Sequence, residues 1–168
     1  MAADETMAAM AERSAGELRD ELAIDEAVVD AVERLAGASV GLTSRVLGER
    51  STASEMTLPQ WRVLVLAGAA PGGLPVGEIA FRIGASAPSA SRFVRRLERQ
   101  GLVQIVRDSL DRRVVRVRPT AQGGEVREAI IERRRELIRE ALAGRAAGLP
   151  EPAAEALRRV ADALEPYS

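Results

Sequence analysis

The stretch from Val76 to Thr120 constrains the fold of this 168-residue chain more than any other part of it. Its first segment places Ile79, Ala80 and Ile83 at helical spacing, so these apolar residues predict one buried helix face. A tight turn at Gly84 follows, and then a second helical pattern and two β-rich runs. The predicted order is therefore helix, tight turn, helix and two-stranded hairpin.

The second helix of this stretch has an apolar face and a basic face. Ala90, Val94 and Leu97 lie on one side, and Ser86 can cap the helix by accepting a backbone N–H. Gly101 suits the left-handed position after the last helical turn. The basic stripe has the spacing i, i+3, i+4 and i+7, and it consists of Arg92, Arg95, Arg96 and Arg99.

The two β-rich runs span residues 102–107 and 114–118, and the tip between them has the sequence DSLDRR. A helix-turn-helix whose second helix is basic, followed by a basic hairpin, is typical of a unit that reads duplex DNA.

The positive charge of the chain is concentrated on this same region. The net charge is −1, but residues 82–118 contain ten arginines against three acids, a net of +7, whereas residues 1–60 have a net of −7. All 24 basic residues are arginine, whose planar guanidinium matches phosphate and guanine geometry. This distribution favours double-stranded DNA as the partner.

The composition excludes several other functions. The chain has no histidine and no cysteine, which removes the usual general base, the usual metal ligands and thiol redox chemistry. We therefore expect no enzyme activity, no cofactor and no metal site. No stretch approaches the ~20 apolar residues of a membrane span. The acidic N-terminus argues against a signal peptide, so we expect a cytoplasmic protein without a membrane partner.

Three motifs lie within roughly residues 57 to 124: TLPQWRVL, SAPSASRFVRRLERQGLV and DRRVVRVRPTAQG. Together they resemble the multiple-antibiotic-resistance regulator (MarR) family of winged-helix transcription factors. The most specific piece is Asp111-x-Arg113 followed by Thr120-x-x-Gly123. The resemblance implies a mainly α fold with a small β-wing, in which a winged helix-turn-helix is joined to N- and C-terminal dimerisation helices.

Three positions depart from the family pattern. Pro119 stands where leucine is usual, and because proline lacks a ladder donor we expect the second wing strand to end early or to lie at a sheet edge. Pro75 replaces a frequent capping threonine, which predicts proline in the first turn of the following helix. Leu110 is an unusual apolar residue at the wing tip.

Amphipathic helices are predicted on both sides of the winged unit. The first spans 24–50, and its Gly37, Gly41 and Gly48 each cost roughly 1 kcal/mol relative to alanine, which is easier to explain if another helix approaches closely. Thr120 caps a long helix from 121 to about 145, and a last helix follows. The resemblance implies that the first and last helices of two protomers interleave in a homodimer.

The predicted domains are a flexible or weakly helical extension at 1–23, with a docked extra helix as the alternative, an N-terminal dimerisation helix and linker at 24–56, the winged unit at 57–120 and the C-terminal dimerisation helices at 121–168.

Short polar side chains at the start of a recognition helix can reach base edges. We assign Ser89 and Arg92 to base or base-adjacent contacts, and Ser86 and Ser91 lie at the same end of the helix; Ser86 can serve as the N-cap as well. The phosphate contacts are assigned to Arg95, Arg96 and Arg99. By resemblance, Arg113 enters the minor groove, Asp111 orients it and Arg112 lies along the phosphates; the alternative is a solvated surface pair.

Other residues keep two interpretations. Trp61 is either a core anchor or a wall of an effector pocket, in which Arg45 or Arg62 supplies charge for a phenolic or anionic organic ligand. The run Arg133-Arg134-Arg135 is read as a solvated, salt-bridged face, with a second DNA contact as the alternative.

The function predicted is that of a homodimeric, sequence-specific repressor, released from a pseudo-palindromic operator by a small organic ligand. The alternative is a winged-helix module that uses its basic face on an acidic protein partner.

Overall fold

The computed structural model describes residues 25–49, 56–107, 115–144 and 152–164. The chain divides into two units, Met1–Ala38 and Ser39–Ser168, and the division falls within α2 (Glu26–Gly48). The predicted extension at 1–23 lies outside the described residues. The four-part domain division remains a prediction, and the elements described below belong to the second unit.

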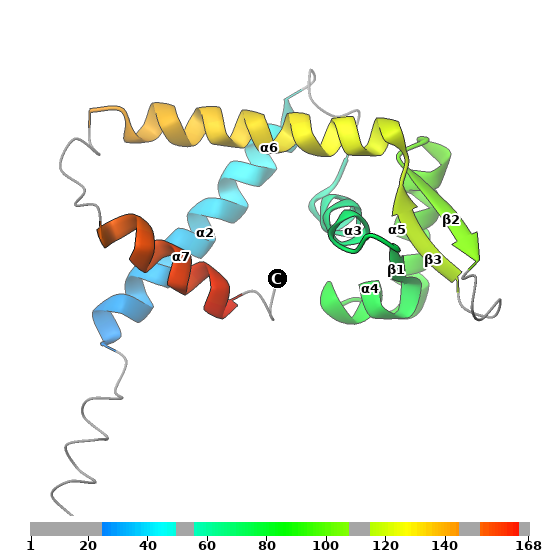
Figure 1. The fold of residues 1–168 in the computed structure, drawn as a ribbon, viewed down its shortest axis with the longest axis horizontal. Coiled ribbons are helices and arrows are strands. Elements are labelled where there is room, and N and C mark those ends of the chain that lie inside the picture. The colour runs from blue at the N-terminus through cyan, green and yellow to red at the C-terminus, as the bar shows by residue number, and fades with distance from the viewer. Residues whose placement is uncertain (1–24, 50–55, 108–114, 145–151, 165–168) are drawn as a thin grey trace, which may run out of the picture. The chain divides into compact units, whose positions relative to one another are not determined.

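The second unit is mainly helical with one small sheet, which confirms the predicted fold class (Figure 1). Its helices and strands, in chain order, are α3 (Leu58–Ala69), β1 (Leu74–Pro75), α4 (Val76–Arg82), α5 (Ala87–Arg99), β2 (Val103–Arg107), β3 (Val115–Pro119), α6 (Ala121–Leu142) and α7 (Pro152–Leu164).

Local sequence signals explain where α3 and α5 begin. The Thr57 N–H before α3 donates to Gln60 Oε1 at 2.9 Å, the contact expected from their capping-box spacing. Ser86 caps α5, because its Oγ accepts the Ser89 N–H at 3.4 Å. The turn between α4 and α5 has Gly84 in the left-handed region, at φ 66°.

The sheet has the order β1-β3-β2, and both pairings are antiparallel. The β2–β3 hairpin is the predicted wing, whereas β1 was not predicted, because two residues give no strand pattern. Pro75 pairs with Arg116 in extended geometry and serves as the N-cap of α4. The expectation of proline in the first turn of this helix is therefore wrong.

The prediction for Pro119 is also wrong, since β3 is the central strand and includes this proline as its last residue. The Thr120 N–H donates to Leu102 O at 3.0 Å, so these two residues form a hydrogen-bonded pair. Hydrogen-bonded and non-hydrogen-bonded pairs alternate along an antiparallel ladder. Pro119, opposite Val103, belongs to a non-hydrogen-bonded pair and needs no N–H toward β2. On the other side β1 has already ended, because its register covers Arg116 and Val117. The sheet loses no hydrogen bond to the proline.

The core is aliphatic and lies between α3, α4, α5, the sheet and α6. Its fully buried side chains include Leu64 of α3, Ile79 of α4, Leu97 of α5, Val117 of β3 and Ile130 of α6. Full burial of such a side chain stabilises the fold by roughly 1.5–3 kcal/mol. Both α5 and the first half of α6 are therefore anchored on one core.

Large apolar side chains remain exposed on α2, α6 and α7, which we call the outer helices. Their exposed fractions are between 43% and 53%, and they are Val40, Ile138, Leu142, Leu157 and Leu164. A Cβ added at Gly41 would have no atom within 4 Å among the described residues. These helix faces have no apolar cover within the described part of the chain. No described helix combines the length and the apolar character needed to cross a membrane.

Candidate nucleic-acid interface

The candidate DNA-binding surface is the solvent-exposed face of α5. Ala90, Val94 and Leu97 are 0–1% exposed and pack on the core, as the sequence predicted. Burial of this stripe turns the opposite face outward, because residues on opposite sides of one helix cannot both face the core. The exposed side chains on the outer face include Arg92, Arg95, Arg96 and Arg99.

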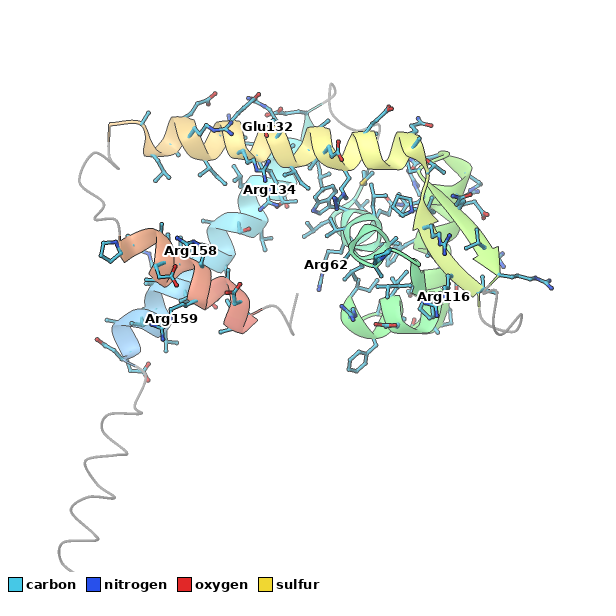
Figure 2. The ribbon with its side chains drawn as sticks, in the orientation of Figure 1. Arg62, Arg116, Glu132, Arg134, Arg158 and Arg159 are labelled. Carbon is cyan, nitrogen blue, oxygen red and sulfur yellow. The ribbon has the colours of Figure 1, made fainter. Side chains whose placement is uncertain are left out.

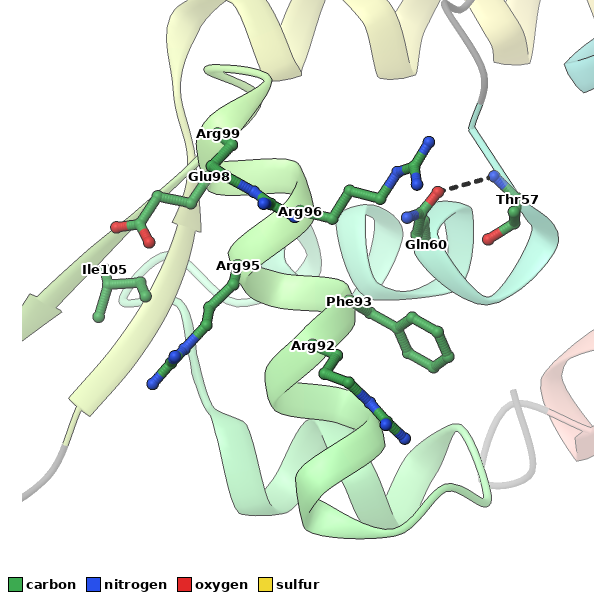
Figure 3. A pocket seen from close by; sticks show the side chains of 9 residues that line it. All are labelled: Thr57, Gln60, Arg92, Phe93, Arg95, Arg96, Glu98, Arg99 and Ile105. Atoms are coloured by element: carbon green, nitrogen blue, oxygen red, sulfur yellow. Dashed lines mark hydrogen bonds between the residues drawn. The ribbon is translucent and has the colours of Figure 1, made fainter.

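These arginines line an open groove of about 1010 Å³ that also touches the start of α3 and strand β2. The remaining lining residues are Thr57, Gln60, Phe93, Glu98 and Ile105 (Figure 3). Figure 3 shows Arg95 and Arg96 projecting from α5 in different directions. Four cations and one carboxylate therefore surround the groove, a balance that suits a polyanion.

The structure brings together the residues predicted to read bases. Ser86 Oγ donates to Ser89 Oγ at 3.0 Å, and Arg92 Nη2 donates to the same Ser89 oxygen at 3.0 Å. This holds one end of the guanidinium at the N-terminal end of α5 and leaves its other N–H groups for a ligand. Ser91 is half-buried.

Two arginines of β3 are attached to the loop between α3 and β1. Arg116 Nη1 donates to Gly73 O at 3.2 Å, and Arg118 Nε donates to Gly72 O at 2.7 Å. The loop can approach because Gly73 has φ 73° and a Cβ there would lie 2.4 Å from Val117 O. No sequence pattern indicated this role, and both residues had been counted simply as basic charge.

The predicted wing residues Asp111, Arg112 and Arg113, and also Leu110, lie outside the described residues. Their assignments remain predictions.

The three residues predicted for a ligand pocket have different environments. Trp61 is 5% exposed and packs in the core, as the core-anchor interpretation expects, and Arg45 is exposed on α2. Arg62, labelled in Figure 2, donates from Nη2 to Arg82 O at 2.9 Å. Arg62 also lines a cavity of about 390 Å³. The cavity also touches Ser86 and Ser89 at the start of α5, but neither described cavity is lined by Arg45 or Trp61.

The arginine run on α6 agrees with the prediction at two of its three positions. Arg133 Nε pairs with Glu49 Oε2 at 2.9 Å, and Arg135 Nη1 pairs with Glu132 Oε2 at 3.4 Å. The hydrogen bond that Arg133 donates lowers the pKa of Glu49, and the hydrogen bonds that Arg133 donates to Glu49 and Glu136 raise its own pKa.

The solvated-face prediction is wrong for Arg134. It lies one turn after the buried Ile130 on the same stripe of α6, so its side chain points toward α2 (Figure 2). Its Nη2 donates to Ser39 Oγ at 3.0 Å, and its buried Nε has no hydrogen-bond partner among the described residues. Burial lowers the pKa of this guanidinium.

A basic second helix, a β-wing and a groove lined by arginines define a winged helix-turn-helix DNA-binding protein. A model described as the MarR family matches residues 54–114. The PcaV transcriptional regulator from Streptomyces coelicolor is 32% identical, with a TM-score of 0.50, over 85% of this chain and 99% of that chain. This chain belongs to the MarR family of transcriptional regulators.

Two further solved structures share the fold. RV1404 from Mycobacterium tuberculosis has a TM-score of 0.70 at 22% identity, over 84% of this chain and 95% of that chain. CouR from Rhodococcus jostii RHA1, bound to p-coumaroyl-CoA, has a TM-score of 0.59 at 24% identity, over 82% and 90%. No curated protein matches the chain. MarR-family members regulate transcription and are not enzymes, which confirms that expectation.

Proposed function

We propose that this protein is a homodimeric repressor that binds a pseudo-palindromic operator through α5 and the wing. The observation that carries the proposal is the outer face of α5, where the Ser86–Ser89–Arg92 cluster adjoins three further exposed arginines. In the proposal, Ser89 and Arg92 contact bases, and Arg95, Arg96 and Arg99 contact phosphates. On the wing, Arg113 enters the minor groove, oriented by Asp111, and Arg112 follows the phosphates.

The dimer is supported by the uncovered apolar faces of the outer helices. A second copy supplies the same faces, and a two-fold dimer would place two α5 helices on half-sites about one helical turn, ~10 bp, apart. The pseudo-palindrome follows from that symmetry.

Capture of genomic fragments, followed by footprinting, tests the proposal. Two protected half-sites support it, whereas protection of one half-site contradicts it. On the captured operator, Arg92→Ala should weaken binding by ~1–3 kcal/mol and relax sequence preference, while Arg95→Ala should reduce the salt slope by about 1. The control is Arg135→Ala, since Arg135 lies on α6 and pairs with Glu132. Binding to an acidic protein but to no duplex would favour the interaction-module alternative.

We further propose that a small aromatic or phenolic anion releases the operator. PcaV has been solved with its natural ligand and CouR with p-coumaroyl-CoA, so structural neighbours bind ligands, and in CouR the ligand is an aromatic acyl-CoA. In this chain the cavity beside Arg62 combines that cation with Leu58, Ile83 and Phe93, a lining that suits an apolar body carrying one negative charge. A tenfold loss of operator affinity requires a coupling of about 1.4 kcal/mol.

A panel of aromatic acids, including 4-hydroxybenzoate and p-coumarate, tests the effector. A ligand at Arg62 should release DNA from the wild type but much less from Arg62→Met. Arg45→Met tests the second predicted cation in the same assay, and emission from Trp61 reports binding. If no acid changes Trp61 emission or operator affinity, the effector proposal fails while the DNA-binding proposal is unaffected.

A further inference from the structure

The end of α5 is joined directly to the start of α6 through Thr120. The Thr120 hydroxyl donates to Gly101 O at 2.5 Å, and the Thr120 N–H donates to Leu102 O at 3.0 Å. The same hydroxyl oxygen caps α6 by accepting the Gly123 N–H at 3.0 Å. One side chain therefore connects the turn that leaves the recognition helix to the first turn of α6.

Two glycines allow this close approach. Gly101 has φ 74°, and a Cβ added at Gly123 would lie 1.8 Å from Leu102 O. The turn is itself bonded to the last turn of α5, because the Gly101 N–H donates to Glu98 O and the Leu102 N–H donates to Leu97 O, both at 2.9 Å. The backbone of the turn is thus hydrogen-bonded to the last turn of α5 and is in close contact with the first turn of α6.

We propose that Thr120 and Gly123 are positioning residues that hold α5 at a fixed angle to α6. The proposal rests on the DNA-reading function given above. α6 is 22 residues long, about 33 Å at 1.5 Å per residue, and its exposed apolar residues Ile138 and Leu142 lie near its far end. A dimer contact that fixes the far end of α6 therefore also fixes the direction of α5 in each protomer. The direction of the two α5 helices in turn sets the half-site spacing that the dimer accepts.

The simpler role for Thr120 is an N-cap that stabilises α6 alone. The two roles need different parts of the hydroxyl, because capping needs an acceptor and the Gly101 contact needs a donor. An ionised aspartate caps well but cannot donate. Thr120→Asp should therefore keep the cap on α6 and lose the hydrogen bond to Gly101 O, whereas Thr120→Ser should keep both contacts. Gln122→Glu adds the same charge in the same turn at an exposed position, and it keeps the shape of the Gln122 side chain, whose Oε1 lies beside Gly101.

The angle can be measured without DNA. Because the chain has no cysteine, Glu98→Cys on α5 and Arg135→Cys on α6 can carry a unique pair of spin labels for double electron–electron resonance. Labelled protein is diluted with unlabelled protein to suppress distances between protomers. We expect a narrow distance distribution in the wild type, in Thr120→Ser and in Gln122→Glu. Thr120→Asp and the hydroxyl-free Thr120→Val should both broaden or shift it. An unchanged distribution in both variants would overturn the proposal, whatever their stability.

The second readout is binding to operators whose half-site spacing is changed by one base pair, which moves a half-site by ~3.4 Å. The wild type, Thr120→Ser and Gln122→Glu should each lose about tenfold or more in affinity, equivalent to about 1.4 kcal/mol. Thr120→Asp should discriminate clearly less between the two spacings. Wild-type discrimination in Thr120→Asp would contradict a role in DNA reading. A changed angle in a protein that binds no duplex would refute the proposed function and leave the positioning role in place.

Discussion

Two adjacent glycines at the start of α6 should respond oppositely to the same substitution. At Gly123 the new Cβ would lie 1.8 Å from Leu102 O, whereas at Gly124 it would meet no atom within 4 Å. Ordinary van der Waals contact begins at 3.4 Å, so Gly123→Ala must separate α6 from the turn by about 1.6 Å, the difference between the two distances. That movement would break the bonds from Thr120 to Gly101 O and Leu102 O.

The magnitude follows from these contacts. Two hydrogen bonds contribute about 1 kcal/mol each, and overpacking costs about 1–3 kcal/mol. Alanine regains up to ~1 kcal/mol relative to glycine in a helix, which leaves a net loss of about 2–4 kcal/mol for Gly123→Ala. Gly124→Ala should instead gain about 0.5–1 kcal/mol.

Urea unfolding followed by the fluorescence of Trp61, which is buried, measures both variants. Protein concentration must be equal in all samples, because the stability of a dimer depends on it. The reasoning is refuted if Gly123→Ala is as stable as Gly124→Ala, since the close approach of α6 to Leu102 would then have no energetic consequence.

The Glu49–Arg133 ion pair should make stability depend on pH. Because Arg133 lowers the pKa of folded Glu49, the pair stabilises the fold above the ordinary glutamate value of about 4.3 and loses this effect as pH falls through the folded-state value. The urea midpoint of Glu49→Gln should lie below that of the wild type at pH 7, and the difference should shrink below about pH 4; an equal difference at both pH values would contradict the pairing. Removal of α7 by truncation after Gly148 should produce aggregated or poorly folded protein, as measured by light scattering, because the proposed dimer interface would lose the apolar face of α7 that carries Leu157 and Leu164. A well-folded monomer with a sharp melting transition would exclude the dimer proposal.

Features that depend on local sequence were predicted correctly. The caps at Ser86 and Thr120 need only a short polar side chain before a helix, and the two faces of α5 follow from helical spacing. The left-handed Gly101 was identified for the same reason, because a helix that ends in glycine has few alternatives.

Features that depend on tertiary pairing were missed or misplaced. Strand β1 exists because Leu74 pairs with Val117, more than 40 residues later, and Pro119 is tolerated because β1 ends before reaching it. Arg134 looked solvated within a run of charges, but its position after Ile130 turns it toward α2. Cavities also form from distant segments, so the sequence grouped Arg62 with Trp61, whereas the structure places Arg62 beside Phe93.

Site-directed DNA cleavage tests the central claim, that the N-terminal end of α5 reads duplex DNA. The cysteine-free chain allows one introduced thiol, at Ser89→Cys or at Arg135→Cys, to carry an iron–EDTA group. The account predicts that the probe at position 89 cuts the operator at two sites about one helical turn apart, while the probe at position 135 on α6 cuts weakly or not at all. Strong cutting from position 135 with none from position 89 would show that DNA binds another face of the protein.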